Sequence, residues 1–200
     1  PFTVSPDHVG PDEARAGRWV SGTFGWWWRY DDGNYPTSTQ LRIDGAIYRF
    51  NARGYMVTGW VYEDGQWYYY GASGGQAAGW VHVHGTWYYL DPLTGAMASG
   101  WTKVQGTWYY LSSSGAMRTG WMRDGSAWYY LTSSGALATG WQCVGSSWYY
   151  LSPDGGAMVT GWLRDGDAWY YLTSSGAMAM GSRWIDGTRY AFDDEGRLMP

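Results

Sequence analysis

The sequence predicts an all-β protein, a quasi-linear solenoid of stacked β-hairpins. Three observations carry this prediction. A Gly-Trp pair recurs every 20 or 21 residues, a second Trp follows each of these tryptophans after seven residues, and a turn signal such as Asp-Gly lies between the two. A unit of this length cannot bury its apolar face alone, so it must stack on its neighbours.

Six full copies of the repeat span residues 59–181, and in each copy the second Trp opens a Trp-Tyr-Tyr triplet. We expect residues 1–23 to be a linker or the tail of a preceding domain, and residues 24–58 to form irregular N-terminal capping repeats. Residues 182–200 are expected to form a C-terminal capping repeat, since terminal repeats commonly depart from the consensus. In the degenerate repeat at residues 39–58, Gln40 and Ile47 occupy the two Trp places, so this repeat is expected to bind nothing.

Each repeat is predicted to form a β-hairpin, in which successive side chains of a strand point to opposite faces. A two-residue turn at Asp64-Gly65 would oppose Trp60 to Tyr69 and Tyr62 to Trp67, which places these four rings on one face. The later repeats carry their turn glycine one residue earlier. A turn at Asp124-Gly125 would therefore oppose Trp121 directly to Trp128, with the same face preserved.

The composition favours an aromatic surface that is partly exposed to solvent. Trp occurs 17 times and Tyr 19 times, against four Phe, and both side chains combine an apolar body with a polar tip. The net charge of −4 argues against nucleic acid or an anionic membrane as partner. No apolar run reaches about 18 residues, so no membrane insertion is expected. Cys143 is the single cysteine of the sequence, which excludes a disulfide within the chain.

Paired tryptophans suggest a binding chemistry. The Trp ring face is electron-rich, so rings gathered between hairpins can form a cage for a quaternary ammonium group. A purely structural role would explain part of the set, notably the outward positions of the Tyr68 type. It does not explain the preference for Trp over Leu, Ile or Phe in every full repeat.

The motif Gly-Trp-x6-Trp-Tyr-Tyr followed by Gly-Ala-Met-x-Thr-Gly, as in GWTKVQGTWYYLSSSGAMRTG at residues 100–120, resembles the choline-binding repeat of Gram-positive surface proteins and phage lysins. The resemblance covers residues 24–200. It implies a left-handed β-solenoid in which two Trp of one repeat, a Tyr of the next and a Met near the floor hold choline. It also implies a secreted, cell-wall-associated module of the bacterial surface, whose partner is the choline or phosphocholine of teichoic acid.

Carried over residue by residue, the resemblance implies a set of ligand-binding side chains, with the second Tyr of each triplet as the third wall. They are Trp60, Trp67 and Tyr89; Trp80, Trp87 and Tyr110; Trp101, Trp108 and Tyr130; Trp121, Trp128 and Tyr150; Trp141, Trp148 and Tyr171; and Trp162 and Trp169, whose next repeat offers Ala191 instead of Tyr. The matching methionines are Met97, Met117, Met158 and Met178, with Leu137 in one repeat and none in the first.

Several alternatives stay open or are disfavoured. Similar hairpins bind α-glucan in extracellular enzymes and cell-surface sugars in toxins, so a carbohydrate-binding module is the second hypothesis. We expect no catalytic residue, metal site or cofactor within the chain, because His82 and His84 lack a third ligand and acids such as Asp64 and Asp124 precede turn glycines. The start of the chain lacks a signal-peptide pattern, so a longer precursor is expected. A homodimer through a terminal hairpin is left open.

Overall fold

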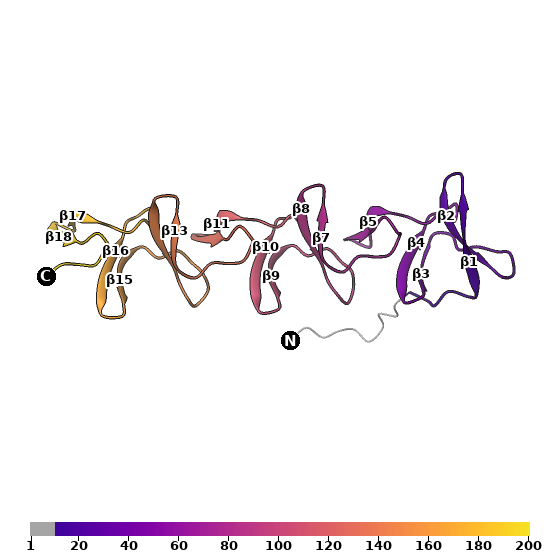
Figure 1. Ribbon diagram of the computed structural model, residues 1–200, viewed down its shortest axis with the longest axis horizontal. Coiled ribbons are helices and arrows are strands. Elements are labelled where there is room, and N and C mark those ends of the chain that lie inside the picture. The colour runs from indigo at the N-terminus through magenta and orange to yellow at the C-terminus, as the bar shows by residue number, and fades with distance from the viewer. Residues whose placement is uncertain (1–10) are drawn as a thin grey trace. The chain divides into compact units, whose positions relative to one another are not determined.

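The computed structural model describes residues 11–200, which form eighteen strands paired into antiparallel hairpins, with no helix among these residues (Figure 1). The chain divides into two compact units, of which unit 1 ends at Ala98 and unit 2 spans Ser99–Pro200. Unit 1 holds β1 (Gly17–Gly22), β2 (Gly25–Tyr30), β3 (Thr39–Ile43), β4 (Ala46–Phe50), β5 (Gly59–Glu63), β6 (Gln66–Tyr70), β7 (Gly79–Val83) and β8 (Thr86–Leu90). Unit 2 holds β9 (Gly100–Val104), β10 (Thr107–Leu111), β11 (Gly120–Asp124), β12 (Ala127–Leu131), β13 (Gly140–Val144), β14 (Ser147–Leu151), β15 (Gly161–Asp165), β16 (Ala168–Leu172), β17 (Gly181–Ile185) and β18 (Thr188–Phe192).

All the full repeats share one strand register. The predicted pairing of the first repeat is confirmed, with Trp60 opposite Tyr69 and Tyr62 opposite Trp67. The predicted shift in later repeats is wrong, because Trp121 lies opposite Tyr130, as Trp60 lies opposite Tyr69.

The reason lies in the turns. Asp64 and Gly65 both have positive φ, as in a type I′ turn, whereas Gly125 is the first of its two turn residues and alone takes a positive φ, as in a type II′ turn. Both turn types have two residues, so an earlier glycine changes the turn and leaves the register unchanged.

A row of fully buried side chains holds each unit together. The last residue of each second strand, from β4 to β18, is at most 2% exposed: Phe50, Tyr70 and Leu90 in unit 1, and Leu111, Leu131, Leu151, Leu172 and Phe192 in unit 2. Within a unit, the loop after a hairpin returns to the preceding hairpin, as where the Met158 N–H donates to the Trp128 carbonyl at 2.7 Å. Stacked hairpins joined by backbone hydrogen bonds confirm the predicted fold class within each unit.

The N-terminal boundary differs from the prediction. Strand β1 begins at Gly17 and pairs with β2 around a turn at residues 23 and 24, so the expected boundary at residue 23 falls inside a hairpin. Residues 11–14 also lie against the second hairpin, where the Ala14 N–H donates to the Arg42 carbonyl at 2.9 Å. The remainder of the expected linker, residues 1–10, lies outside the described residues.

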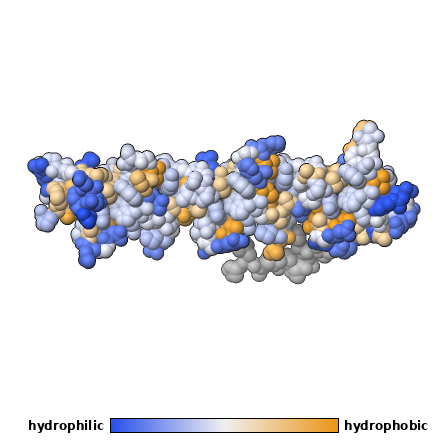
Figure 2. Space-filling model, in the orientation of Figure 1, coloured by the Kyte–Doolittle hydropathy of each residue, from blue (hydrophilic) through white to orange (hydrophobic). Residues whose placement is uncertain are grey.

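Apolar side chains appear at the surface as small patches among hydrophilic ones (Figure 2). Much of the aromatic surface is pale in this view, because Trp and Tyr have intermediate hydropathy. Among residues 11–200, no helix has the length and apolar character needed to cross a membrane.

Candidate functional site

The clearest candidate site is a cavity between consecutive hairpins of unit 2. Trp121 and Trp128 come from hairpin β11–β12, Tyr149 comes from the next hairpin, and Met158 comes from the loop that follows it. These side chains surround a cavity of about 370 Å³, with Ser174 and Ser175 at its rim. The rings therefore leave open space, within the roughly 300–1,000 Å³ usual for small-molecule sites.

The three aromatic walls stand at steep angles to one another. In hairpin β15–β16 the rings of Trp162 and Trp169 lie 6.3 Å apart at 83°. The Trp121 ring meets Tyr149 of the next hairpin at 4.8 Å and 68°. Such edge-to-face pairs pack the rings against one another at their edges, and the ring faces that remain free line the cavity beside Trp121. Several aromatic faces around one open space suit a cationic ligand.

The cage recurs along both units. In six places the first Trp of one hairpin contacts the first Tyr of the next, with ring centroids 4.8–5.0 Å apart. The contacts are Trp19–Tyr48 and Trp60–Tyr88 in unit 1, and Trp101–Tyr129, Trp121–Tyr149, Trp141–Tyr170 and Trp162–Tyr190 in unit 2.

The third wall is thus the first tyrosine of each triplet, and the expectation of the second does not fit this geometry. The second tyrosines lie against the first Trp of their own hairpin, with ring centroids 5.1–5.2 Å apart: Tyr89, Tyr110, Tyr130, Tyr150 and Tyr171. The cause is the stacking of the hairpins. The cage lies between the Trp face of one hairpin and the opposite face of the next, and the first tyrosine points from that opposite face.

This arrangement also completes a cage that the sequence left in doubt. The replacement of a second tyrosine by Ala191 does not remove the third wall beside Trp162 and Trp169. Tyr190 supplies it at 4.8 Å from Trp162, and Leu198 takes the methionine place, its N–H bonded to the Trp169 carbonyl at 2.8 Å.

A further cage in unit 1 escaped the sequence analysis. Trp19, Trp26, Tyr48 and Met56 line a cavity of about 400 Å³. The signal was the spacing of seven residues between Trp19 and Trp26, the same as in the full repeats. It was hidden because Arg18, not Gly, precedes the first Trp.

The predicted methionines occupy equivalent places. Met97, Met158 and Met178 each follow the hairpin that supplies the tyrosine, and each N–H donates to the second Trp carbonyl of the preceding hairpin at 2.7–2.8 Å. Leu137 does the same for Trp108. Met158 packs directly on Gly176, where an added Cβ would overlap its sulfur.

The remaining predicted site residues fall in different units. Trp80 and Trp87 lie on one face of hairpin β7–β8 in unit 1, with ring centroids 6.4 Å apart at 86°. Met117 belongs to unit 2, where it packs on Gly135, and Tyr110 lies against Trp101. A choline site made from Trp80, Trp87 and residues of unit 2 stays a prediction.

Carboxylates lie beside two of the cages. The Trp101 indole N–H donates to Asp124 and that of Trp141 to Asp165, each at 2.9 Å. The cavity beside Trp141 has Asp194 and Glu195 in its lining. Negative charge at the rim of an aromatic cage favours a cationic ligand.

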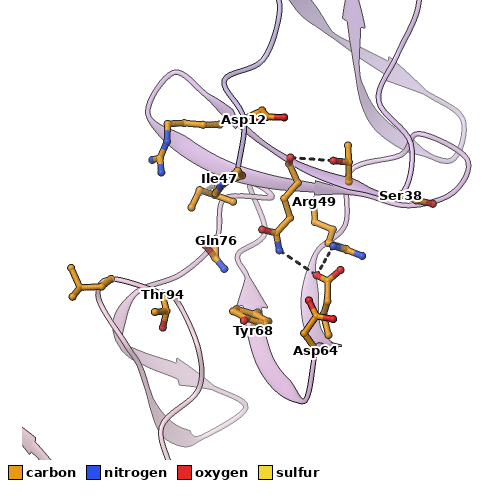
Figure 3. Close-up of a pocket in the computed structure, with 14 residues that line it drawn as sticks. Asp12, Ser38, Ile47, Arg49, Asp64, Tyr68, Gln76 and Thr94 are labelled. Atoms are coloured by element: carbon orange, nitrogen blue, oxygen red, sulfur yellow. Dashed lines mark hydrogen bonds and ion pairs between the residues drawn. The ribbon is translucent and has the colours of Figure 1, made fainter. Parts of the chain in front are cut away.

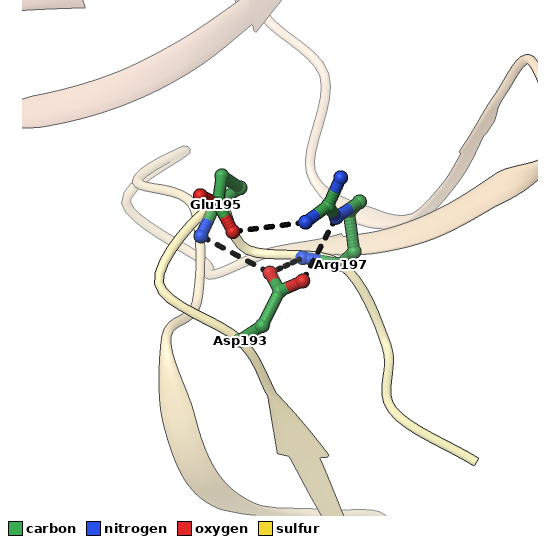
Figure 4. Close-up of polar contacts among 3 residues, drawn as sticks. All are labelled: Asp193, Glu195 and Arg197. Carbon is green, nitrogen blue, oxygen red and sulfur yellow. Dashed lines mark hydrogen bonds and ion pairs between the residues drawn. The ribbon is translucent and has the colours of Figure 1, made fainter.

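The acidic loop at this cavity is fixed by an arginine (Figure 4). The Arg197 guanidinium donates to Asp193 at 2.8 Å and to Glu195 at 2.9 Å. The hydrogen bond from Arg197 holds the pKa of Asp193 below its ordinary value, so Asp193 stays ionised at neutral pH.

The second Trp of every full repeat is 42–44% exposed, so one edge of each cage reaches solvent. In the second full repeat, the His82 ring lies against the Trp87 ring, with centroids 4.8 Å apart. Within residues 11–200 no group of three His, Cys, Asp or Glu side chains is placed to hold a metal ion, and Cys143 is exposed.

Known structures share this architecture. The chain is 37% identical to CbpJ from Streptococcus pneumoniae, with a TM-score of 0.76 over 88% of this chain and 62% of that one. Choline-binding protein F from the same organism, crystallised with a peptidoglycan analogue, gives 37% identity and a TM-score of 0.76 over 88% and 61%. The pneumococcal modular autolysin LytC gives 34% identity and a TM-score of 0.66 over 92% and 42%.

The chain therefore spans about three-fifths of the first two structures and less than half of the third. No curated protein sequence matches it. The model of the choline-binding repeat matches residues 37–78, 63–100, 77–119, 98–139, 118–161 and 138–184. Together with the recurring Trp and Tyr cages, this shows that the chain belongs to the choline-binding repeat family, whose repeats are non-catalytic binding modules.

Proposed function

We propose that the chain holds choline groups of a bacterial wall teichoic acid in its aromatic cages and thereby anchors a larger secreted protein at the cell surface. The observation that carries this proposal is the recurring open cage of two Trp, the first Tyr of the next hairpin and a Met or Leu. Its cavities of about 370–400 Å³ can admit a trimethylammonium head.

The expected affinity of one cage is low. Each cation–π contact contributes roughly 0.5–2 kcal/mol, so three walls give about 2–5 kcal/mol, near millimolar affinity. The Asp194 carboxylate should make the cage beside Trp141 one of the tighter sites, whereas the charge of Glu195 is largely offset by its ion pair with Arg197.

Repetition raises the overall affinity. A polymer that carries choline at intervals can occupy several cages of one chain, so each further contact becomes intramolecular. Such linkage raises the apparent affinity by about 10²–10⁴ when the spacing allows simultaneous binding. The repeated weak site therefore suits retention on a repeating polymer better than capture of free choline.

A choline titration tests the proposal directly. Intrinsic Trp fluorescence should respond to millimolar choline, and the chain should bind a tertiary-amine resin and elute with free choline. A resin of uncharged dextran serves as the carbohydrate control. Retention on dextran with no response to choline would overturn the proposal in favour of a glucan-binding module.

A further inference from the structure

The degenerate repeat of unit 1 borders an open cavity unlike the aromatic cages. Gln40 and Ile47 stand at the two Trp places, and a cavity of about 490 Å³ lies beside them. We call it the Gln40 pocket, lined among others by Gln40, Arg42, Arg49, Glu63, Tyr68 and Gln76 (Figure 3). Its volume lies within the roughly 300–1,000 Å³ usual for small-molecule sites.

One wall of the pocket carries hydrogen-bonding groups at the positions where the full repeats carry aromatic rings. Hairpin β3–β4 pairs Gln40 with Arg49 and Arg42 with Ile47. In hairpin β5–β6 these four places hold Trp60, Tyr69, Tyr62 and Trp67. An aromatic surface has thus been replaced by an amide, two guanidinium groups and one aliphatic side chain.

The facing wall keeps one ring and adds carboxylates. Tyr68 stands where the other cages have their wall tyrosine, and Glu63 and Asp64 come from the same hairpin. Gln76 occupies the methionine place, its N–H bonded to the Ile47 carbonyl at 2.8 Å.

A hydrogen-bond network fixes these polar groups before any ligand arrives. The Gln40 amide donates to the Tyr70 hydroxyl at 2.9 Å and to Glu63 at 3.3 Å, and Arg49 forms an ion pair with Glu63. Tyr70 replaces the buried Leu of later repeats, and burial raises the pKa of its hydroxyl to about 12. It therefore stays neutral, as an acceptor for Gln40, at any physiological pH.

The mixed charges select against ions. The two Trp faces that would hold a quaternary ammonium are missing, and the Arg42 and Arg49 guanidinium groups offset the attraction of the carboxylates for a cation. The carboxylates of Asp12, Glu63 and Asp64 oppose an anion such as phosphate. A neutral ligand rich in hydroxyl groups meets neither penalty.

We propose that the Gln40 pocket binds a neutral pyranose unit of a glycan. The Tyr68 ring takes the C–H face of the sugar, because the partly positive C–H groups meet the negative face of the ring. The guanidinium, amide and carboxylate groups exchange hydrogen bonds with the ring hydroxyls, and bonds to charged groups are the stronger ones. One chain would then hold choline in its cages and a sugar in this separate pocket.

Saturation-transfer NMR on the whole chain tests this assignment. Maltotriose and the N-acetylglucosamine trimer are offered one at a time, with saturating choline present so that the aromatic cages are occupied. At least one of the two should receive magnetisation at its ring C–H protons. Inorganic phosphate, followed by chemical shifts of the chain, should leave the pocket unchanged.

Two variants locate the site. Tyr68→Leu removes the ring, and Gln76→Met restores the side chain that packs in the same place in other repeats. Each should weaken sugar binding at least about fivefold and leave the choline titration unchanged. Tyr149→Leu, in an aromatic cage of unit 2, is the matched control and should leave sugar binding intact.

Four outcomes would overturn the proposal. Neither sugar binds, or both pocket variants bind sugar as well as the unchanged chain, or phosphate binds there in place of sugar. Loss of sugar binding in Tyr149→Leu would likewise overturn it, since the sugar would then occupy the aromatic cages.

Discussion

The two tyrosines of one triplet should differ in their effect on a single cage. Tyr149 faces Trp121 and Trp128 of the preceding hairpin, whereas Tyr150 lies against Trp141 of its own hairpin. Each Tyr→Leu substitution removes one Trp–Tyr contact of nearly equal length, 4.8 Å for Tyr149 and 5.1 Å for Tyr150. The two substitutions therefore remove a similar amount of packing, but only Tyr149→Leu removes a wall of the cage of Trp121 and Trp128.

The expected magnitude follows from the loss of one wall. Removing one cation–π contact worth about 0.5–2 kcal/mol weakens choline binding at that cage by about 2- to 30-fold. Tyr149→Leu should show this loss at the cage of Trp121 and Trp128, and Tyr150→Leu should leave that cage close to its original affinity. Leu is preferred to Phe because Phe would keep the ring.

The assay must resolve individual cages. Indole N–H resonances in ¹⁵N-correlated spectra report each tryptophan separately during a choline titration, and Trp162, in another cage, serves as the internal reference. The reasoning fails if Tyr150→Leu weakens binding at Trp121 and Trp128 while Tyr149→Leu does not.

Other substitutions probe packing, site number and charge. Gly176→Ala forces a Cβ into the neighbouring methionine at a positive φ, so the urea midpoint should fall by the equivalent of about 1–3 kcal/mol, and an unchanged midpoint would contradict this packing. Trp26→Ala should remove one choline equivalent in equilibrium dialysis, and the control Trp184→Ala, at a 73% exposed side chain, should remove none. Arg197 lowers the pKa of Asp193 in the folded state. The contact between them therefore stabilises the fold above the unfolded pKa of 3.8, and this stabilisation is lost as the pH falls through the lower folded pKa. Urea midpoints should therefore drop less between pH 5 and about pH 3 in Asp193→Asn than in the unchanged chain, and equal drops would refute the linkage.

The strand register and the aromatic face could be predicted from the sequence because both are local. Alternation along a strand and a two-residue turn fix the partners of Trp60 and Trp67 without reference to any other repeat. The register predicted around Gly125 was wrong because an earlier glycine was expected to shift the turn by one residue, whereas it changes only the turn type.

The third wall of each cage could not be predicted in this way. Whether Tyr149 or Tyr150 faces Trp121 depends on which face of the next hairpin is presented, and alternation within one hairpin carries no information on that stacking. The N-terminal cage was missed for a different reason. Trp19 lacks the preceding glycine that marks the full repeats, although its spacing to Trp26 is the same.

Every cage draws its parts from consecutive repeats, and the loop N–H that bonds back to a Trp carbonyl ties those repeats together. A single repeat cut out of the chain would therefore carry part of two cages and no complete cage. Duplicating one internal repeat would add a single complete site and leave the others intact, so binding capacity can grow in unit steps. If the cages hold choline as proposed, recombination of repeats alone would match the number of sites to wall polymers of different length, with no new side-chain chemistry.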